Sequence, residues 1–230
     1  LSAGGSKDAL AIHAGLFGDE RLDELLLQWF LLRRQFAQRF QHDGDFTVAT
    51  GGADLFGQGE FLGSGEPLTR QAVVANPREA AAYTYCYNDA LFVQRVHDVL
   101  TLVSWVSGDE HEPKRLNLIG TNGAGPIAAA ARVVAKGMVN KLAVDTQGFR
   151  FGDLTSYRAP NFLVGAVKYG DLPALLALSA PHPLWIGGEK GLTPKVVKSA
   201  FAASGAAKAV QSSAQQNAVD SAVKWLLASP

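Results

Sequence analysis

The sequence predicts an α/β fold, a mostly parallel sheet flanked by helices. Two observations predict it. Short apolar segments bounded by glycine or charged residues alternate along the chain with longer segments of helical periodicity. A glycine-rich turn also joins one such strand, Leu116–Gly120, to a helix opened by Pro126. With 230 residues and 47% hydrophobic content, the chain can bury one sizeable core, so residues 1–230 are expected to form a single domain.

The elements ahead of this turn follow from local patterning. Residues 1–17 are Gly- and Ala-rich and are expected to be a loose arm. From Asp19 to Gln41, large apolar residues recur at helical spacing, which predicts an amphipathic helix with a wide apolar face. The remaining expected elements are a strand at Phe46–Thr50, loop over most of 62–78, a strand at Tyr83–Tyr87 and a helix at Asp89–Val106.

The turn itself has a distinctive composition. Gly120, Gly123 and Gly125 surround the bend, Pro126 suits the first turn of a helix, and the alanine-rich helix runs to about Met138. Two kinds of site share this plan: the elbow that holds the nucleophile of a hydrolase, and the phosphate-binding turn of a dinucleotide fold. The elements expected after it are strands at Leu142–Val144, Leu184–Ile186 and Ala207–Gln211, and helices at Leu172–Leu178, Thr193–Ala203 and Gln215–Ala228.

Composition narrows the classes of function. The net charge is zero and basic residues are dispersed, so neither a nucleic-acid partner nor a membrane surface is predicted. No apolar run is long enough to span a bilayer, and no cofactor is expected. No metal is expected either, because the consecutive residues Asp109–Glu112 are typical of a solvated turn. Cys86 is expected to be a buried structural thiol. The chain begins at Leu1 and shows no signal peptide, so compartment is not indicated.

Several stretches together resemble the α/β-hydrolase superfamily, and more closely bacterial acetyl xylan esterase-like or dienelactone-hydrolase-like proteins. The resemblance covers roughly residues 46–228, whereas strands that normally precede this region are expected to be missing or replaced. It rests on the order and spacing of Tyr83–Asn88, Gln94–Leu100, Leu118–Gly120 with the turn after it, Asp145–Phe151, Lys168–Pro173 and Pro183–Glu189.

This resemblance implies that the turn is a catalytic elbow without the nucleophile and the histidine that catalysis needs. Laying G-x-S-x-G on the turn puts Asn122 at the nucleophile position, and an amide is no nucleophile for acyl transfer. The triad histidine belongs on the loop after the last strand, but Gln211–Gln216 contains none, and His182 is expected at the opposite end of the sheet. Glu189 and Asp145 stand where a triad acid would lie. The N–H of Gly123 would supply half of an oxyanion hole, with the backbone near Asn88 as a candidate for the other half.

The predicted function is therefore an α/β-hydrolase-like protein related to carbohydrate esterases, inactive or acting as a binding module for a small ester or carbohydrate. Two alternatives stay open. One is an active carboxylic ester hydrolase that uses Ser156, Ser179 or Ser212, and the other is a dinucleotide-binding protein, in which Asp145 would bind the ribose. The missing strands leave room for a homo-oligomer or for a preceding partner segment, and the helix Asp19–Gln41 is expected to cover the exposed sheet.

Overall fold

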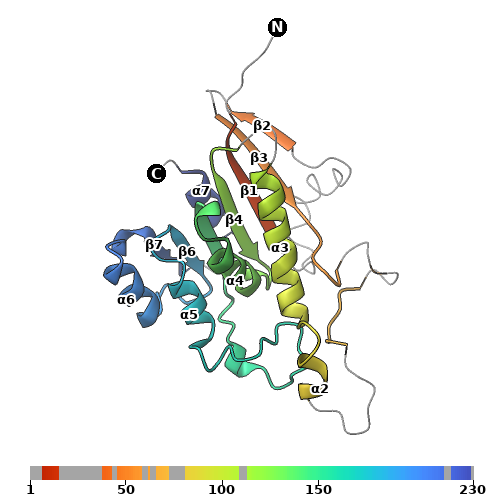
Figure 1. Cartoon of the computed structure of the whole chain (residues 1–230). Coiled ribbons are helices and arrows are strands. Elements are labelled where there is room, and N and C mark those ends of the chain that lie inside the picture. The colour runs from red at the N-terminus through yellow and green to blue at the C-terminus, as the bar shows by residue number, and fades with distance from the viewer. Residues whose placement is uncertain are drawn as a thin grey trace.

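The computed structural model describes residues 7–15, 38–42, 46–58, 62, 66–72, 81–108, 113–214 and 219–228. A seven-stranded sheet runs through the molecule in the order β2-β3-β1-β4-β5-β6-β7 (Figure 1). Neighbouring strands are parallel except β2, which is antiparallel to β3. The strands are β1 (Lys7–Gly15), β2 (Gln38–His42), β3 (Phe46–Gly52), β4 (Leu116–Thr121), β5 (Lys141–Asp145), β6 (Leu184–Gly187) and β7 (Val210–Ser212).

Helices cover both faces of the sheet (Figure 1). On one face α4 packs on β4 and β5, with α3 and α5 on either side of it and α6 beside α5. On the other face α7 packs on β4 and β5. Short 3₁₀ helices lie after α4, after β5 and before β7. The helices are α2 (Ala81–Tyr85), α3 (Leu91–Ser107), α4 (Gly125–Ala135), α5 (Asp171–Ala177), α6 (Lys195–Ala203) and α7 (Val219–Leu227), and the 3₁₀ helices are η2 (Lys136–Met138), η3 (Phe151–Asp153) and η4 (Ala207–Ala209).

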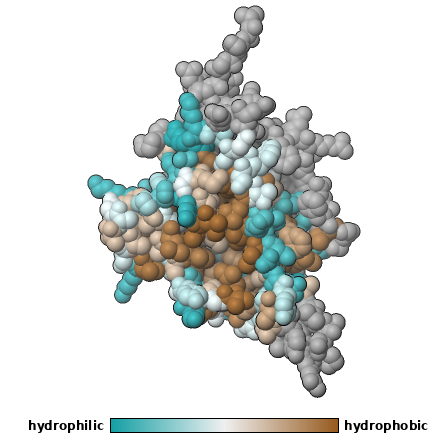
Figure 2. Space-filling model, in the orientation of Figure 1, coloured by the Kyte–Doolittle hydropathy of each residue, from teal (hydrophilic) through white to brown (hydrophobic). Residues whose placement is uncertain are grey.

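The two faces of the sheet carry separate hydrophobic cores. The larger core joins β4, β5 and β6 to α3, α4, α5 and α6, and includes the fully buried Leu118, Ile127 and Phe201. Apolar side chains also gather on the surface over this face (Figure 2), and Val134 on α4 is 60% exposed. Among the helices that the structure describes, none is long and apolar enough to cross a membrane.

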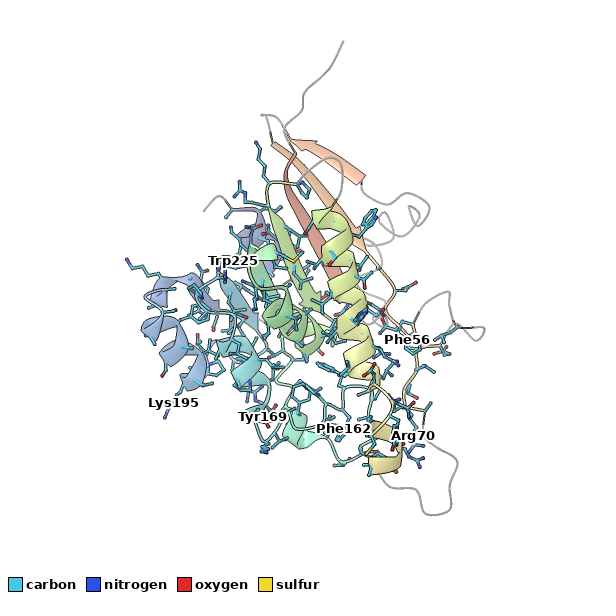
Figure 3. The ribbon with its side chains drawn as sticks, viewed as in Figure 1. Phe56, Arg70, Phe162, Tyr169, Lys195 and Trp225 are labelled. Carbon is cyan, nitrogen blue, oxygen red and sulfur yellow. The ribbon has the colours of Figure 1, made fainter. Side chains whose placement is uncertain are left out.

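The smaller core holds α7 against the opposite face through Ile119, Ala143, Trp185, Ala222 and Leu226. Two strand residues also bond to the last carbonyls of α7, which a helix leaves without internal partners. Asn117 Nδ2 donates to Leu226 O at 3.3 Å, and Lys141 Nζ donates to Ala228 O at 2.5 Å. Figure 3 shows Trp225 on this helix, where its ring lies beside the Lys141 ammonium.

The predicted α/β class is confirmed, and the elements from Leu116 to Ala203 lie within a few residues of their expected bounds. The alanine-rich helix ends at Ala135 and continues as η2 to Met138. The expected last strand at Ala207–Gln211 is η4 followed by β7, and α7 begins at Val219 because residues 215–218 of the predicted closing helix lie outside the described part. The helix predicted at Asp89–Val106 is α3, which starts two residues later.

The N-terminal expectations need correction. Residues 7–15 of the predicted loose arm form β1, and Gln38–Gln41, the end of the predicted helix, belong to β2. Two strands thus precede β3 in the chain and lie in the sheet. Residues 1–6 and 16–37, including most of the helix predicted over Asp19–Gln41, lie outside the described residues. In β1 the apolar residues form a nearly continuous run, which is typical of a parallel strand covered on both faces.

The strand predicted at Tyr83–Tyr87 is also wrong, because this segment forms the short helix α2 and the turn after it. Its residues have high β propensity, but tertiary contacts override this preference and hold the segment in a helix. Tyr85 donates its hydroxyl to Tyr157 O at 2.5 Å, its ring lies 5.2 Å from that of Phe162, and Thr84 is 1% exposed. Cys86, expected to be buried, is exposed at the end of this helix.

Candidate functional site

The centre of the candidate site is the tight turn between β4 and α4. Asn122 and Gly123 both have positive φ angles, of 50° and 84°, and Ala124 N donates to Thr121 O at 2.9 Å. Two successive positive φ angles closed by this bond define a type I′ turn, for which Asn-Gly is the favoured sequence. The turn places Asn122, which is half-buried, at the carboxyl end of β4.

Two glycines let the elements around this turn pack without a gap. A Cβ at Gly120 would come within 2.6 Å of the Ala128 Cβ on α4. A Cβ at Gly125 would come within 2.2 Å of Asp145 O, at the end of β5. Both distances are shorter than any van der Waals contact between these atoms. The start of α4 therefore lies directly against the carboxyl end of β5.

Asp145 is the last residue of β5 and lies next to this turn. Its Oδ1 accepts a hydrogen bond from Gln147 N at 3.0 Å. In the register of the sheet Asp145 pairs with Gly187, and a Cβ at Gly188 would lie 2.7 Å from Asp145 Oδ1. Asp145 thus lies at the carboxyl end of β5, where its main-chain carbonyl packs against Gly125 and its carboxylate bonds to Gln147 N.

Glu189 follows β6 and is bound to a different partner. Arg150 forms a bidentate ion pair with it, at 2.8 Å from Nη1 to Oε1 and 2.6 Å from Nη2 to Oε2. Thr146 Oγ1 also donates to Glu189 Oε1 at 2.7 Å. This Thr146 is buried, and its backbone N–H donates to Gly187 O at 3.1 Å. Glu189 therefore ties the loop after β5 to the loop after β6.

The electrostatics of this pair follow from its contacts. Burial alone would raise the pKa of Glu189, but the hydrogen bonds from Arg150 and Thr146 and the charge of Arg150 outweigh it, so the pKa lies below its usual value. The hydrogen bond to Glu189 raises the pKa of Arg150. Both groups are held in their charged forms at neutral pH. A carboxylate so engaged has little freedom to orient a catalytic histidine.

The histidines whose side chains the structure describes lie away from the turn. His182 precedes β6, at the amino edge of the sheet as expected. Burial and the nearby charge of Arg132, near the end of α4, both lower its pKa. His97 is exposed on α3. His13 and His42 lie in β1 and β2, where only the backbone is described, and His111 with the acidic run Asp109–Glu112 lies outside the described residues.

The three serines considered as substitute nucleophiles are either buried or in contact with another polar group. Ser179 is 1% exposed at the end of α5, which lies toward the amino edge of the sheet. Ser212 Oγ lies 2.6 Å from Thr193 Oγ1. Ser156 Oγ accepts a hydrogen bond from Arg158 N at 3.1 Å, as in a local turn. Ser179 O accepts a hydrogen bond from His182 N at 3.0 Å, which joins the two main chains and does not involve the serine hydroxyl.

Sequence reasoning missed the strand that lies beside the elbow. In the sheet β1 is the neighbour of β4, and Gly15 pairs with Thr121, the residue before Asn122. Asn88, near which the second oxyanion donor is expected, follows α2, and its Nδ2 donates to Thr84 O at 2.8 Å. The signal that could have revealed β1 is the apolar run Leu10–Ile12 ending in small residues, a pattern that resembles the segment before the turn itself.

The network around Arg150 had no signal in the sequence, because 39 residues separate Arg150 from Glu189. Within the described residues no three His, Cys, Asp or Glu side chains gather closely enough to hold a metal ion.

The comparisons with known proteins bear on the fold. A candidate acetyl xylan esterase from Bacteroides fragilis superposes with a TM-score of 0.52 at 14% identity, over 92% of this chain and 60% of that one. Est1E from Butyrivibrio proteoclasticus with ferulic acid bound gives 0.48 at 15% identity, over 92% and 80%. A candidate dienelactone hydrolase from Klebsiella pneumoniae gives 0.45 at 13% identity, over 94% and 76%.

Only the first of these three TM-scores exceeds 0.5, so the fold assignment rests on it together with the sheet order and the β4–α4 turn. No protein-family model matches the sequence, and the search of curated proteins gave no match. The chain has an α/β-hydrolase-like fold. It spans 60% of the length of the Bacteroides fragilis protein that it resembles.

Proposed function

We propose that this protein is a hydrolase-like protein without acyl-transfer activity, whose elbow serves structure or binding. The observation that carries the proposal is the Asn122-Gly123 turn, with positive φ at both residues and a closing hydrogen bond of 2.9 Å. The turn lies where a nucleophile elbow would, between a strand and a helix, but the side chain at its tip is an amide whose nitrogen lone pair is delocalised. Ester attack at this position has no nucleophile.

The surroundings of the turn support the same proposal. The segment Gln211–Gln216, which includes the end of β7 and the residues after it, contains no histidine to act as a base. Glu189, one of the two candidate acids, is committed to Arg150 and Thr146. Asp145 is left beside the turn, where its carboxylate binds the backbone of Gln147. A binding role for the elbow would use Asn122, Asp145 and the Gly123 N–H toward a small ester or carbohydrate.

The test is hydrolysis of p-nitrophenyl acetate by the full chain and by Ser156→Ala, Ser179→Ala and Ser212→Ala. We expect all four proteins to release p-nitrophenol at the rate of buffer with an unrelated protein. Turnover by the parent that disappears in one serine variant with an unchanged circular dichroism spectrum would replace this proposal with an active esterase.

A further inference from the structure

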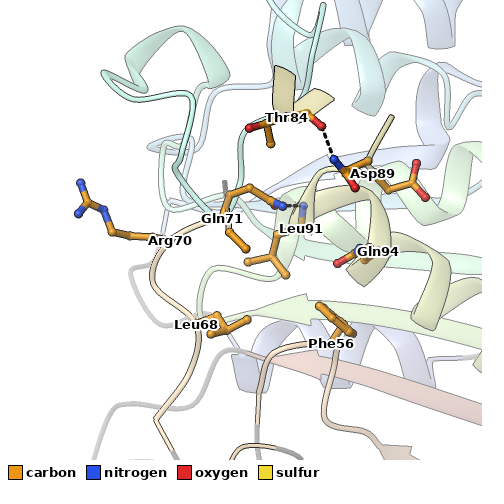
Figure 4. Close-up of a pocket in the computed structure, with 10 residues that line it drawn as sticks. Phe56, Leu68, Arg70, Gln71, Thr84, Asp89, Leu91 and Gln94 are labelled. Carbon is orange, nitrogen blue, oxygen red and sulfur yellow. Dashed lines mark hydrogen bonds between the residues drawn. The ribbon is translucent and has the colours of Figure 1, made fainter. Parts of the chain in front are cut away.

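A concave pocket lies between the start of α3 and the loop after β3. Its volume is about 340 Å³, within the range of small-molecule pockets, and Figure 4 shows the residues that line it. None of them belongs to the β4–α4 turn or to the loops that carry Asp145 and Glu189.

Hydrogen bonds between segments far apart in the sequence hold one wall of this pocket. Phe56 N donates to Asp98 Oδ2 at 2.6 Å, and Phe56 O accepts from Arg95 Nε at 3.1 Å. Both partners lie on α3, so the backbone that carries the Phe56 ring is fixed to this helix. Leu68 N donates to Gly57 O at 2.8 Å, which fixes the neighbouring part of the wall.

The opposite wall is fixed in the same way. Gln71 Oε1 accepts from Leu91 N at 2.6 Å, which caps the start of α3, and Gln71 N donates to Arg158 O at 2.8 Å. Asn88 Nδ2 donates to Thr84 O, as the dashed line in Figure 4 shows. The pocket is therefore preorganised, and a ligand would lose little affinity to ordering of its walls.

The chemistry of the pocket is apolar with uncharged hydrogen-bonding groups. Phe56 and Leu68 lie on one side, 52% and 39% exposed, so their burial by a ligand would be favourable. Gln94 offers a side-chain amide beside them, and Gln71 retains its Nε2 as a donor (Figure 4). The hydroxyl of Thr84 is buried in the pocket wall without a hydrogen-bond partner among the described residues.

The two charged residues that line the pocket do not point into it. Figure 4 shows the guanidinium of Arg70 and the carboxylate of Asp89 directed away from the space between Phe56, Leu68 and Leu91. A charged ligand group would therefore gain no ion pair from either of these side chains. An amide, in contrast, can both donate to and accept from a hydroxyl.

We infer that this pocket is a binding site for a small uncharged molecule with an apolar ring and a hydroxyl group, whose ring packs on Phe56 and Leu68 and whose hydroxyl bonds to Gln94. The inference does not depend on the elbow being inactive. Benzyl alcohol is a suitable probe, with toluene lacking the hydroxyl and benzoate carrying a charge in its place.

The experiment is titration of the full chain with each probe, followed by the shifts of the Leu91 and Gln94 backbone amide signals in ¹H–¹⁵N spectra. We expect saturable binding of benzyl alcohol, at least tenfold weaker binding of benzoate, and weaker binding of toluene. Gln94→Leu should weaken the binding of benzyl alcohol by about fivefold to tenfold and leave the affinity for toluene unchanged.

A filled pocket supplies the second test. Leu68→Trp should abolish the shifts, whereas Leu178→Trp, at an exposed leucine elsewhere, should leave them as in the parent. If Leu68→Trp does not fold, Gln94→Leu decides alone. Absence of saturation with benzyl alcohol, equal or tighter binding of benzoate, or unchanged benzyl alcohol affinity in Gln94→Leu would each overturn the inference.

Discussion

Gly125 lies so close to the main chain of Asp145 that a Cβ atom at position 125 would come within 2.2 Å of the Asp145 carbonyl oxygen. This contact joins the first residue of α4 to the last residue of β5. It explains why the turn after β4 needs a small residue at its end, independently of any catalytic role. The position of Asp145 at the elbow is thus set by packing between main chains.

The first prediction follows from this contact. Gly125→Ala should lower the free energy of unfolding by about 1–3 kcal/mol, because the added methyl forces α4 and β5 apart. Gly137→Ala is the matched control, since a Cβ there would meet no atom within 4 Å. Urea denaturation of both variants checks the prediction. Equal stabilities of the two variants would show that the close packing is not maintained in solution.

A second prediction concerns the backbone of the elbow. Asn122 has a φ of 50°, a conformation that asparagine and glycine tolerate better than other residues. Asn122→Ala should therefore cost about 1 kcal/mol of stability, whereas Asn122→Gly should stay within a few tenths of the parent. Thermal denaturation distinguishes them. If the Asn122→Ala and Asn122→Gly variants are equally stable, the turn does not have the positive φ that the structure gives it.

Much of the fold could be predicted from residue patterns after position 89, because each strand there is a short apolar run that ends at a small or acidic residue. β4 and β5 are buried throughout their centres and are followed by a turn and by a loop that the sequence marks with glycine. The positions of Asn122, Gly123, Asp145 and Glu189 at one edge follow from parallel strand order alone.

In the N-terminal half the strand predicted at Phe46–Thr50 is confirmed as β3, but β1 and α2 were not predicted. In β1 the alanines and the glycine have low β propensity, so the apolar run Leu10–Ile12 is a weak signal, and pairing with β3 and β4 stabilises the strand. In α2 the reverse holds, since Tyr85 has high β propensity but is held in a helix by Tyr157 and Phe162. The ion pair of Arg150 and Glu189 is likewise a long-range contact that no local pattern signals.

A third prediction uses the pH dependence of that ion pair. The pKa of Glu189 is lower in the folded protein than its ordinary value of 4.5, so its ionised form is favoured by folding. The stabilisation is fully present above the unfolded pKa and is lost as the pH falls through the folded pKa. Glu189→Gln should thus be less stable than the parent by about 1–3 kcal/mol at pH 7, with the difference shrinking below pH 4.5.

Urea denaturation at pH 7 and at pH 3 measures this difference. Asp220→Asn removes an exposed carboxylate from the first turn of α7 and is the control; loss of its interaction with the helix dipole should cost less than about 1 kcal/mol at pH 7. A Glu189→Gln difference that stays constant across this range would mean that the ion pair does not determine the titration of Glu189.

The fourth prediction separates the geometry of the elbow from its chemistry. Asn122→Ser restores a hydroxyl at the nucleophile position, but the segment after β7 still offers no histidine to remove its proton. We expect this variant to hydrolyse p-nitrophenyl acetate no faster than the parent and to show no burst of acyl-enzyme. A burst that Asn122→Ser shows and the parent lacks would mean that another group, with Asp145 as a candidate, serves as the base.

The last prediction concerns how α7 is held on the sheet. Leu226 is 4% exposed and packs with Ile119, Ala143 and Trp185, whereas Leu227, one residue on, is 42% exposed. Leu226→Ala should lower the free energy of unfolding by about 2–5 kcal/mol, because it leaves a cavity in the smaller of the two cores.

Leu227→Ala makes the same chemical change on the outer side of the helix and should cost less than about 0.5 kcal/mol. The carbonyl of Leu226 accepts from Asn117 in both variants, so loss of this hydrogen bond does not explain a difference between them. Urea denaturation followed by tryptophan fluorescence measures both, since Trp185 and Trp225 lie in or beside this core. Equal destabilisation by the two substitutions would place α7 off the sheet in solution, and the face that carries Ile119 and Ala143 would then need another cover.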